Sequence, residues 1–157
     1  QIKGINLLPV TTSSIYLGRD PDFVKRNLAE LPAQSAAYAK RMRQPDPPDI
    51  WQDIFAKYLA LVDPAAALAQ WNRWGAVEFG DTRSHTLHWI LSLQRMGIPD
   101  PTVTADTPLY TVFRRPDGSK TYLAYNAGPA AITVHFSDGV QLDVPARTLV
   151  EKGPGSN

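Results

Sequence analysis

The sequence contains no cysteine, and this absence excludes disulfide bridges and thiolate metal sites. Small secreted domains usually depend on disulfides, so the absence alone favours the cytosol. That argument loses its weight if the chain is part of a large secreted enzyme, whose hydrophobic core is big enough without them. The length of 157 residues allows one ordinary domain or two small units.

Other features are missing as well. No apolar run reaches the roughly 18 residues that a membrane-spanning helix needs. The 16 basic and 15 acidic residues form no basic stripe, so we expect neither nucleic acid nor a membrane as a partner. No signal peptide is visible, and the apolar start from Ile2 to Val10 looks like the middle of something longer. We interpret Gln1 as a fragment boundary or a processed end.

The first part of the chain has the punctuation of helices. Asp20-Pro21 and Asp63-Pro64 each place a capping carboxylate before a proline, which is typical of a helix start. Apolar residues recur at helical spacing after each signal and again from His85 to Met96. These patterns predict a helical segment over residues 1–98.

Within this segment we make three local predictions. Pro32 should end or kink the helix that begins at Pro21. The helix over 50–61 should be largely buried and should form a hairpin with the helix that follows Pro64. Ser84 is the candidate cap of the last helix.

Residues 99–150 are rich in β-branched and aromatic side chains. Pro116-Asp117-Gly118 and Asp138-Gly139 are turn signals between alternating apolar stretches, so we expect four antiparallel strands and a short fifth over 148–150. The predicted fold is therefore α+β, a helical segment followed by a small antiparallel β-meander, with a disordered tail over 151–157. The preceding helices or a missing domain would cover the apolar face of the meander.

His85 and His88 are spaced like two ligands on one helical face, and Asp81 or Glu78 would have to supply a third. The His-Glu-x-x-His pattern is absent, and two histidines hydrogen-bonded within a packed helix explain the spacing equally well. We expect no metal and no cofactor.

A glycosidase needs two carboxyl groups, one of them an acid with a raised pKa. Most acidic residues here stand at expected helix caps and turns, and Asp53, Glu78 and Asp81 are the ones that lie amid aromatic residues. No pair has a diagnostic spacing, and no Gly-x-Ser-x-Gly or phosphate-binding glycine loop occurs. We expect no catalytic residue in this chain.

The aromatic residues are the better candidates for contact with a sugar ring. Trp51 and Trp89 follow the apolar stripes and should be core, whereas Trp74 beside Gly75 and Tyr16 near Gly18 should be exposed. The predicted substrate-binding residues are Tyr16, Trp74, Asp81 and His85.

Several strings resemble, in order, the carboxy-terminal part of family 81 glycoside hydrolases, which are endo-β-1,3-glucanases. The more specific ones are GDTRSHTLHWILSLQRMG at 80–97 and VTADTPLYTVFRRPDGSKTYLAYN at 103–126. KGINLLPVTTSSIYLG, WQDIFAKYLALVDPAAALAQWN and TVHFSDG at 3–18, 51–72 and 133–139 extend the resemblance over most of the chain. Leu87 stands where the family usually has an aromatic residue.

The resemblance implies an inverting hydrolase with an (α/α)₆ barrel joined to a β-sandwich. The helices would be the last ones of the barrel, and the strands would return to a neighbouring sheet. The catalytic carboxylates of the family lie in a glutamate-rich string upstream, and no counterpart of that string occurs here. The implied protein is secreted, and its partners are laminarin-type β-1,3-glucan and the rest of the parent enzyme as another segment or chain.

Two other functions stay open at this point. A stand-alone, non-catalytic β-glucan-binding module would use Tyr16, Trp74 and the β unit. An independent hydrolase would use Asp81 or Glu78 as its acid.

Overall fold

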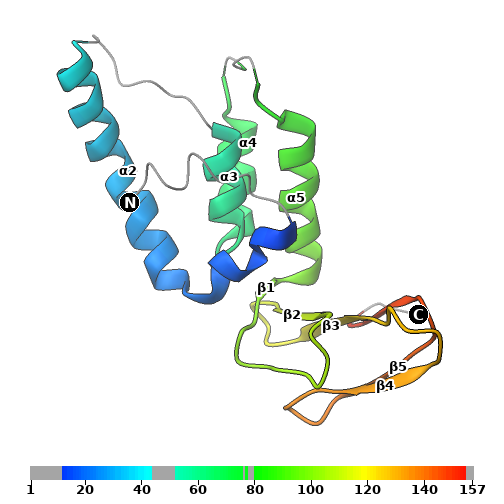
Figure 1. The fold of residues 1–157 in the computed structure, drawn as a ribbon. Helices are drawn as coiled ribbons and strands as arrows, with labels where there is room; N and C mark the ends of the chain where they lie inside the picture. The colour runs from blue at the N-terminus through cyan, green and yellow to red at the C-terminus, as the bar shows by residue number, and fades with distance from the viewer. Residues whose placement is uncertain (1–11, 44–51, 76, 78–79, 155–157) are drawn as a thin grey trace. The chain divides into compact units, whose positions relative to one another are not determined.

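The computed structural model describes residues 12–43, 52–75, 77 and 80–154 of the chain. The chain divides into two compact units, a first unit over Gln1–Gln94 and a second unit over Arg95–Asn157. The described part of the first unit is helical, and the second unit holds the antiparallel strands, so the predicted α+β fold is confirmed (Figure 1). The division lies at 94/95, where the sequence suggests 98/99.

Five helices are described in the chain. Asp20 and Asp63 cap two of them as predicted, since their carboxylates accept hydrogen bonds from Phe23 N and Ala66 N, both at 2.9 Å. None of the described helices is long and apolar enough to cross a membrane. The helices are η1 (Thr12–Arg19, a 3₁₀ helix), α2 (Pro21–Met42), α3 (Gln52–Ala60), α4 (Pro64–Asn72) and α5 (Arg83–Met96).

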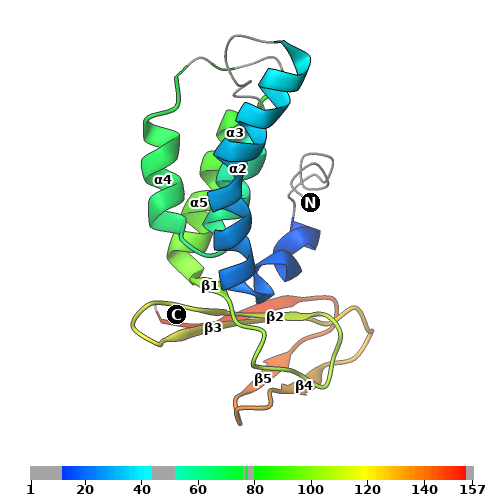
Figure 2. The same cartoon turned by 90° about the vertical axis from the view of Figure 1, so that its left-hand side faces the viewer.

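Helix α3 forms the centre of the first unit (Figures 1 and 2). It packs against α4 in the predicted hairpin and also against α2, and its residues 53–58 are all buried, so the predicted burial is confirmed. Tyr58 accepts a hydrogen bond from Asn27 of α2, and Trp89 of α5 donates one to the carbonyl oxygen of Lys57. Side chains from three helices therefore converge on α3.

The structure tests two local predictions for this unit. Helix α2 continues through Pro32 to Met42, so of the two predicted outcomes, an end or a kink, the end is wrong. Helix α5 begins at Arg83, before Ser84, and the carbonyl oxygen of Thr82 accepts the first hydrogen bond, from Thr86 N at 2.8 Å. Ser84 is therefore an exposed residue of the first helical turn and not its cap.

Replacement of Pro32 by alanine should stabilise the first unit. A proline inside a helix cannot donate the hydrogen bond to the carbonyl four residues earlier, here that of Leu28, and costs about 3 kcal/mol relative to alanine. Because Pro32 is exposed, the substitution disturbs no packing. We expect a gain of about 1–3 kcal/mol in the free energy of unfolding, measured by urea titration. Ala36→Pro, at an equally exposed site of the same helix, is the control and should destabilise.

The described part of the second unit, residues 95–154, contains six strands in two sheets. The larger sheet has the order β1-β2-β3-β6, and the smaller sheet pairs β4 with β5. All pairs are antiparallel. The strands are β1 (Ile98–Pro99), β2 (Tyr110–Arg114), β3 (Lys120–Tyr125), β4 (Ile132–His135), β5 (Gln141–Val144) and β6 (Leu149–Lys152). Strand β6 thus extends two residues into the segment expected as a tail, of which residues 155–157 lie outside the described ones.

The strand order differs from that of a simple meander, because β3 pairs with β6 and not with β4. The two sheets share one hydrophobic core. Tyr122 of β3 packs edge-on against Phe136, with ring centroids 5.0 Å apart. The hairpin of β4 and β5 therefore covers the inner face of the larger sheet, a role that the sequence suggested for the helices or for a missing domain. The buried core residues are Val103, Val112, Tyr122, Ala124, Val134, Phe136, Leu142 and Val144.

Glycines shape the entry to this unit and its turns. Gly118 and Gly139 have φ of +82° and +90° in the two predicted turns, which are confirmed by the hydrogen bonds Arg115 N to Ser119 O and Phe136 N to Val140 O. Gly97, with φ of +105°, ends α5. A Cβ added to Gly97 would lie 2.5 Å from the carbonyl carbon of Arg114. Only glycine allows the chain to pass β2 at this distance.

Candidate functional site

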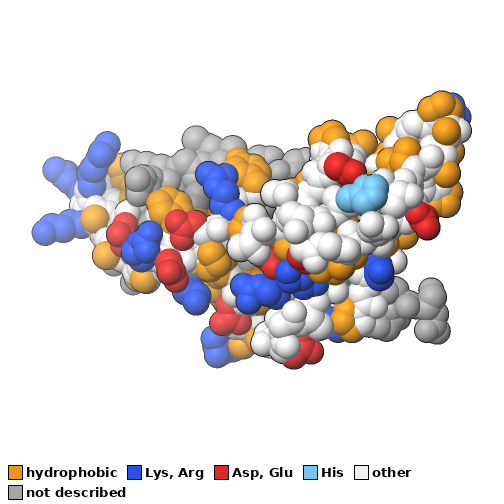
Figure 3. Space-filling view, turned by 90° about the horizontal axis from the view of Figure 1, so that it is seen from below, with side chains coloured by type: hydrophobic (Ala, Val, Ile, Leu, Met, Phe, Trp, Pro, Cys, Tyr) orange, Lys and Arg blue, Asp and Glu red, His pale blue; other side chains and the backbone are white. Residues whose placement is uncertain are grey.

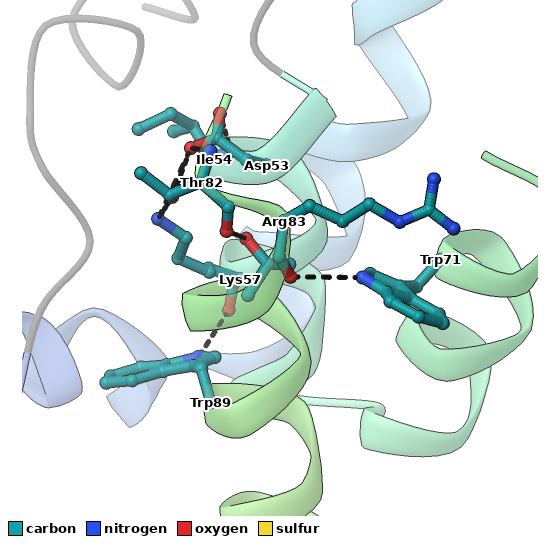
Figure 4. Close-up of polar contacts among 8 residues, drawn as sticks. Asp53, Ile54, Lys57, Trp71, Thr82, Arg83 and Trp89 are labelled. Atoms are coloured by element: carbon teal, nitrogen blue, oxygen red, sulfur yellow. Dashed lines mark hydrogen bonds and ion pairs between the residues drawn. The ribbon is translucent and has the colours of Figure 1, made fainter. Parts of the chain in front are cut away.

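The start of α5 is fixed to α3 by a buried ion pair and a threonine (Figure 4). Thr82 Oγ1 donates to Asp53 Oδ2 at 2.7 Å and accepts from Lys57 Nζ at 2.9 Å. Lys57 Nζ also lies 3.4 Å from Asp53 Oδ2, and Thr82 N donates to the same oxygen at 3.3 Å. We call Asp53, Lys57 and Thr82 the Asp53 network.

The carboxylate of Asp53 is almost fully enclosed and has no free acceptor role. The side chains of Asp53 and Lys57 are only 7 % and 5 % exposed, and Ile54 N donates to Asp53 Oδ1 at 2.8 Å. Burial raises the pKa of Asp53, but the hydrogen bonds from Thr82 and the charge of Lys57 outweigh burial and lower it below its ordinary value of 3.8. Asp53 is therefore ionised at neutral pH and anchors a helix instead of transferring protons.

The lowered pKa of Asp53 predicts how stability depends on pH. A carboxyl group whose pKa is depressed by folding contributes stability above its unfolded pKa, and the contribution is lost as the pH falls through the folded pKa. The difference in unfolding free energy between wild type and Asp53→Asn should thus be largest at pH 7 and should shrink below about pH 4. This difference is measured by urea unfolding followed by tryptophan fluorescence. All four tryptophans lie in the first unit, so their fluorescence reports on the unit that contains Asp53. A difference that stayed constant from pH 7 to pH 3 would contradict the assignment.

Next to the Asp53 network, Arg83 lies over two indole rings. Its guanidinium carbon is 4.5 Å from the ring centroid of Trp71 and 5.8 Å from that of Trp74. Trp71 Nε1 donates to the carbonyl oxygen of Arg83 at 3.2 Å (Figure 4). These contacts join the end of α4 to the start of α5.

Trp74 is buried, with 8 % of its surface exposed, and the prediction that it is exposed is wrong. A position beside a glycine at a helix end suggests an exposed side chain, but in the structure the guanidinium of Arg83 lies over the buried ring. Among the residues that the structure describes, its buried Nε1 atom has no hydrogen-bond partner, which is uncommon for tryptophan. Trp89 is buried as predicted, and Trp51 lies outside the described residues.

The structure brings three of the four predicted substrate-binding residues to one region. Asp81, half-buried, and His85, exposed, flank Thr82 and Arg83 at the start of α5, and Arg83 connects them to Trp74. Tyr16 is 55 % exposed, as expected, but it lies on η1, level with the other end of α5 (Figures 1 and 2). Arg19 covers its ring at 5.5 Å. Tyr16 is therefore separate from the other three.

Five carboxyl groups of the described residues have a pKa below the ordinary value, those of Asp53, Asp100, Asp106, Asp117 and Asp138. Burial raises the pKa of Asp100, but hydrogen bonds from Thr102 and the charges of Lys120 and Arg114 lower it overall. Each shift found for a described carboxyl group is downward, whereas a general acid needs an upward one. Within the described ranges no three His, Asp or Glu side chains are placed to hold a metal. Glu78, proposed both as a metal ligand and as an acid, lies outside them.

Charges of both signs are interspersed on the face of the molecule that Figure 3 shows, with hydrophobic side chains in separate patches between them.

In the second unit Lys120 lies 3.0 Å from Asp138 and 3.7 Å from Asp100. Tyr122 donates to Asp138 at 2.7 Å. Burial and this bond to Asp138 raise the pKa of Tyr122 to about 12. This ion-pair cluster joins β3 to the turn between β4 and β5 and to the segment after β1.

The Asp53 network is the feature that sequence reasoning did not find. Asp53 is recognisable as a carboxyl group amid aromatic residues, and Lys57 stands four residues later, at the spacing of a helical ion pair. The third member, Thr82, comes from a segment 29 residues away from Asp53. Neither periodicity nor local spacing identifies such a partner.

Comparisons with known proteins give the family context. The chain is 45 % identical over 146 residues to a glucan endo-1,3-beta-D-glucosidase of Acetivibrio thermocellus and 41 % identical over 154 residues to one of Thermobifida fusca. These matches cover 93 % and 95 % of the chain but only 18 % and 19 % of the relatives. No family model matches the chain.

A solved structure of a family 81 glycoside hydrolase from Clostridium thermocellum aligns with a TM-score of 0.74 and 38 % identity. The alignment covers 96 % of this chain and 20 % of that structure. Sequence and structure therefore agree that the chain spans about a fifth of the length of the proteins it matches.

Proposed function

The chain corresponds to the carboxy-terminal portion of a family 81 glycoside hydrolase, and from this premise we propose that it is part of an endo-β-1,3-glucanase. The observation that carries the proposal is the 45 % identity, over 93 % of the chain, to a glucan endo-1,3-beta-D-glucosidase. The substrate is β-1,3-glucan of the laminarin type, and the enzyme is secreted and degrades this polysaccharide. The rest of the parent enzyme is the partner.

In this proposal the chain supplies helices and a substrate-contacting surface, and the catalytic carboxyl groups lie elsewhere in the parent enzyme. The downward pKa shifts and the closed hydrogen-bonding shell of Asp53 support this division. The described helices α2 to α5 are the last ones of an α/α barrel. The comparisons give no support to a stand-alone glucan-binding module.

The proposal is tested by exchange of segments. The chain replaces its matching segment in the Thermobifida fusca glucosidase, to which it is 41 % identical over 154 residues. We expect this chimera to release reducing sugar from laminarin, while the 157-residue chain alone and the Thermobifida enzyme without the segment release none. Release of reducing sugar by the chain alone, or a folded chimera without activity, would refute the proposal.

The candidate contacts at the start of α5 are tested in the same chimera. Asp81→Asn and His85→Ala should each lower kcat/KM on laminarin about tenfold, mainly through KM, because the first replaces a charged acceptor of a sugar hydroxyl by a neutral one and the second removes a hydrogen bond to a hydroxyl. Ser84→Ala, an exposed neighbour on the same helical turn, is the matched control and should leave both constants unchanged. Tyr16→Ala tests the separate contact on η1. Unaltered KM in both the Asp81 and His85 variants would remove these residues from the substrate surface.

A further inference from the structure

Three large apolar side chains form an exposed row across the larger sheet of the second unit. Tyr125 of β3 is the register partner of Leu149 of β6, and Tyr125 N donates to the carbonyl oxygen of Leu109 at 2.9 Å. The exposed fractions are 45 % for Leu109, 40 % for Tyr125 and 59 % for Leu149. Directly opposite residues of antiparallel strands have Cβ atoms about 5 Å apart, so the three side chains are contiguous. We call them the 109–125–149 row.

The row lies on the face of the sheet opposite to the core of the unit. Side chains alternate between the two faces of a strand, and Tyr122 and Ala124 of β3 point into the core. Tyr125 therefore points the other way, and Leu149 does so relative to Val150, which packs against the core. The hairpin of β4 and β5 covers the inner face only, so the fold of this unit leaves the row uncovered.

We propose that the 109–125–149 row is a docking surface for an apolar segment of the remaining part of the parent enzyme. The inference rests on the proposed function, in which this chain is about a fifth of a longer glucanase. Isolated exposed apolar residues are ordinary on any protein surface, whereas Tyr125 of β3, Leu149 of β6 and Leu109, which directly precedes β2, form one contiguous apolar patch, the kind of surface that serves as a contact. The row contains one aromatic ring and no charged group, so it fits an apolar protein segment better than a hydroxyl-rich glucan chain.

The test compares Leu149→Glu in the isolated chain and in the Thermobifida chimera. In the isolated chain the glutamate remains in water, so the unfolding midpoint should stay within about 1 °C of the unsubstituted chain. In the chimera it would be buried against an apolar partner, and the midpoint should fall by roughly 4–10 °C. Leu149→Met, which keeps an apolar side chain of similar volume, should preserve the midpoint in both proteins.

Ile132→Glu is the matched control, because Ile132 is 40 % exposed but lies on β4, outside the row. It should have the same small effect in both proteins. Equal effects of Leu149→Glu in the isolated chain and the chimera would overturn the docking surface. So would a dimer of the isolated chain in sedimentation that Leu149→Glu dissociates, since the occupant would then be a second copy. Laminarin hydrolysis by the unsubstituted chimera is a separate readout, so failure of the proposed function is distinguishable from failure of the docking surface.

Discussion

Asp53→Ala should lower the free energy of unfolding of the first unit by about 3–5 kcal/mol. The substitution leaves the ammonium group of Lys57 buried with 5 % of its side chain exposed and without its anionic partner. Loss of one member of a buried ion pair costs this much because the remaining charge keeps its desolvation penalty. The measurement is urea unfolding at pH 7 followed by tryptophan fluorescence.

Two control variants distinguish the ion pair from simple loss of packing. Asp53→Ala combined with Lys57→Met removes both charges and should recover most of the lost stability, since apolar replacement of a buried pair is often neutral. Glu30→Ala removes an exposed hydrogen bond to Gln34, at the same helical spacing, and should change stability by less than about 0.5 kcal/mol. A double variant as unstable as Asp53→Ala would argue against the Asp53 network as the cause.

Gly97→Ala should destabilise the second unit by about 3–5 kcal/mol. A φ of +105° costs a non-glycine residue about 1–3 kcal/mol. The added methyl group would also meet the backbone of Arg114 at 2.5 Å and Arg115 N at 2.8 Å, and backbone atoms in a strand pair cannot move aside cheaply. Amide hydrogen exchange of Tyr122 and Ala124, two core residues of β3, measures the effect.

Gly118→Ala separates the two causes, because Gly118 also has positive φ, +82°, but an added Cβ there meets no atom within 4 Å. It should cost only about 1–2 kcal/mol. If Gly97→Ala cost no more than Gly118→Ala, the close approach of Gly97 to β2 would not be a constraint on the fold.

The sequence predicted those parts of the fold that local chemistry decides. Asp20 and Asp63 cap their helices because a carboxylate before proline satisfies free backbone amides without help from distant residues. Gly118 and Gly139 turn the chain because few other residues adopt their φ. The register of β2 and β3 follows directly from the first of these turns.

The Ser84 cap was a local error of two positions, whereas the wrong predictions for Pro32 and Trp74 concern contacts between distant parts of the chain. Helix α2 continues through Pro32 although the helix loses a hydrogen bond there, which tertiary packing of Val24, Asn27 and Ala39 compensates. Trp74 is buried beneath Arg83, a residue of the next helix. An aromatic residue beside a glycine at a helix end can contact a sugar, or it can pack between two successive helices. The sequence around Trp74 does not distinguish these two cases.

The order β1-β2-β3-β6 also has a consequence for synthesis of the chain. Strands leave the ribosome in sequence order, and β3 pairs with β2 within a short hairpin as soon as both have emerged. Its other edge finds a partner only when Leu149–Lys152 appear, after the β4–β5 hairpin has formed. Until then the nascent unit exposes one row of unpaired backbone amides and carbonyls, the kind of edge to which other chains can add. Pairing with β6 covers this edge of β3, and β6 then forms the outer strand of the sheet.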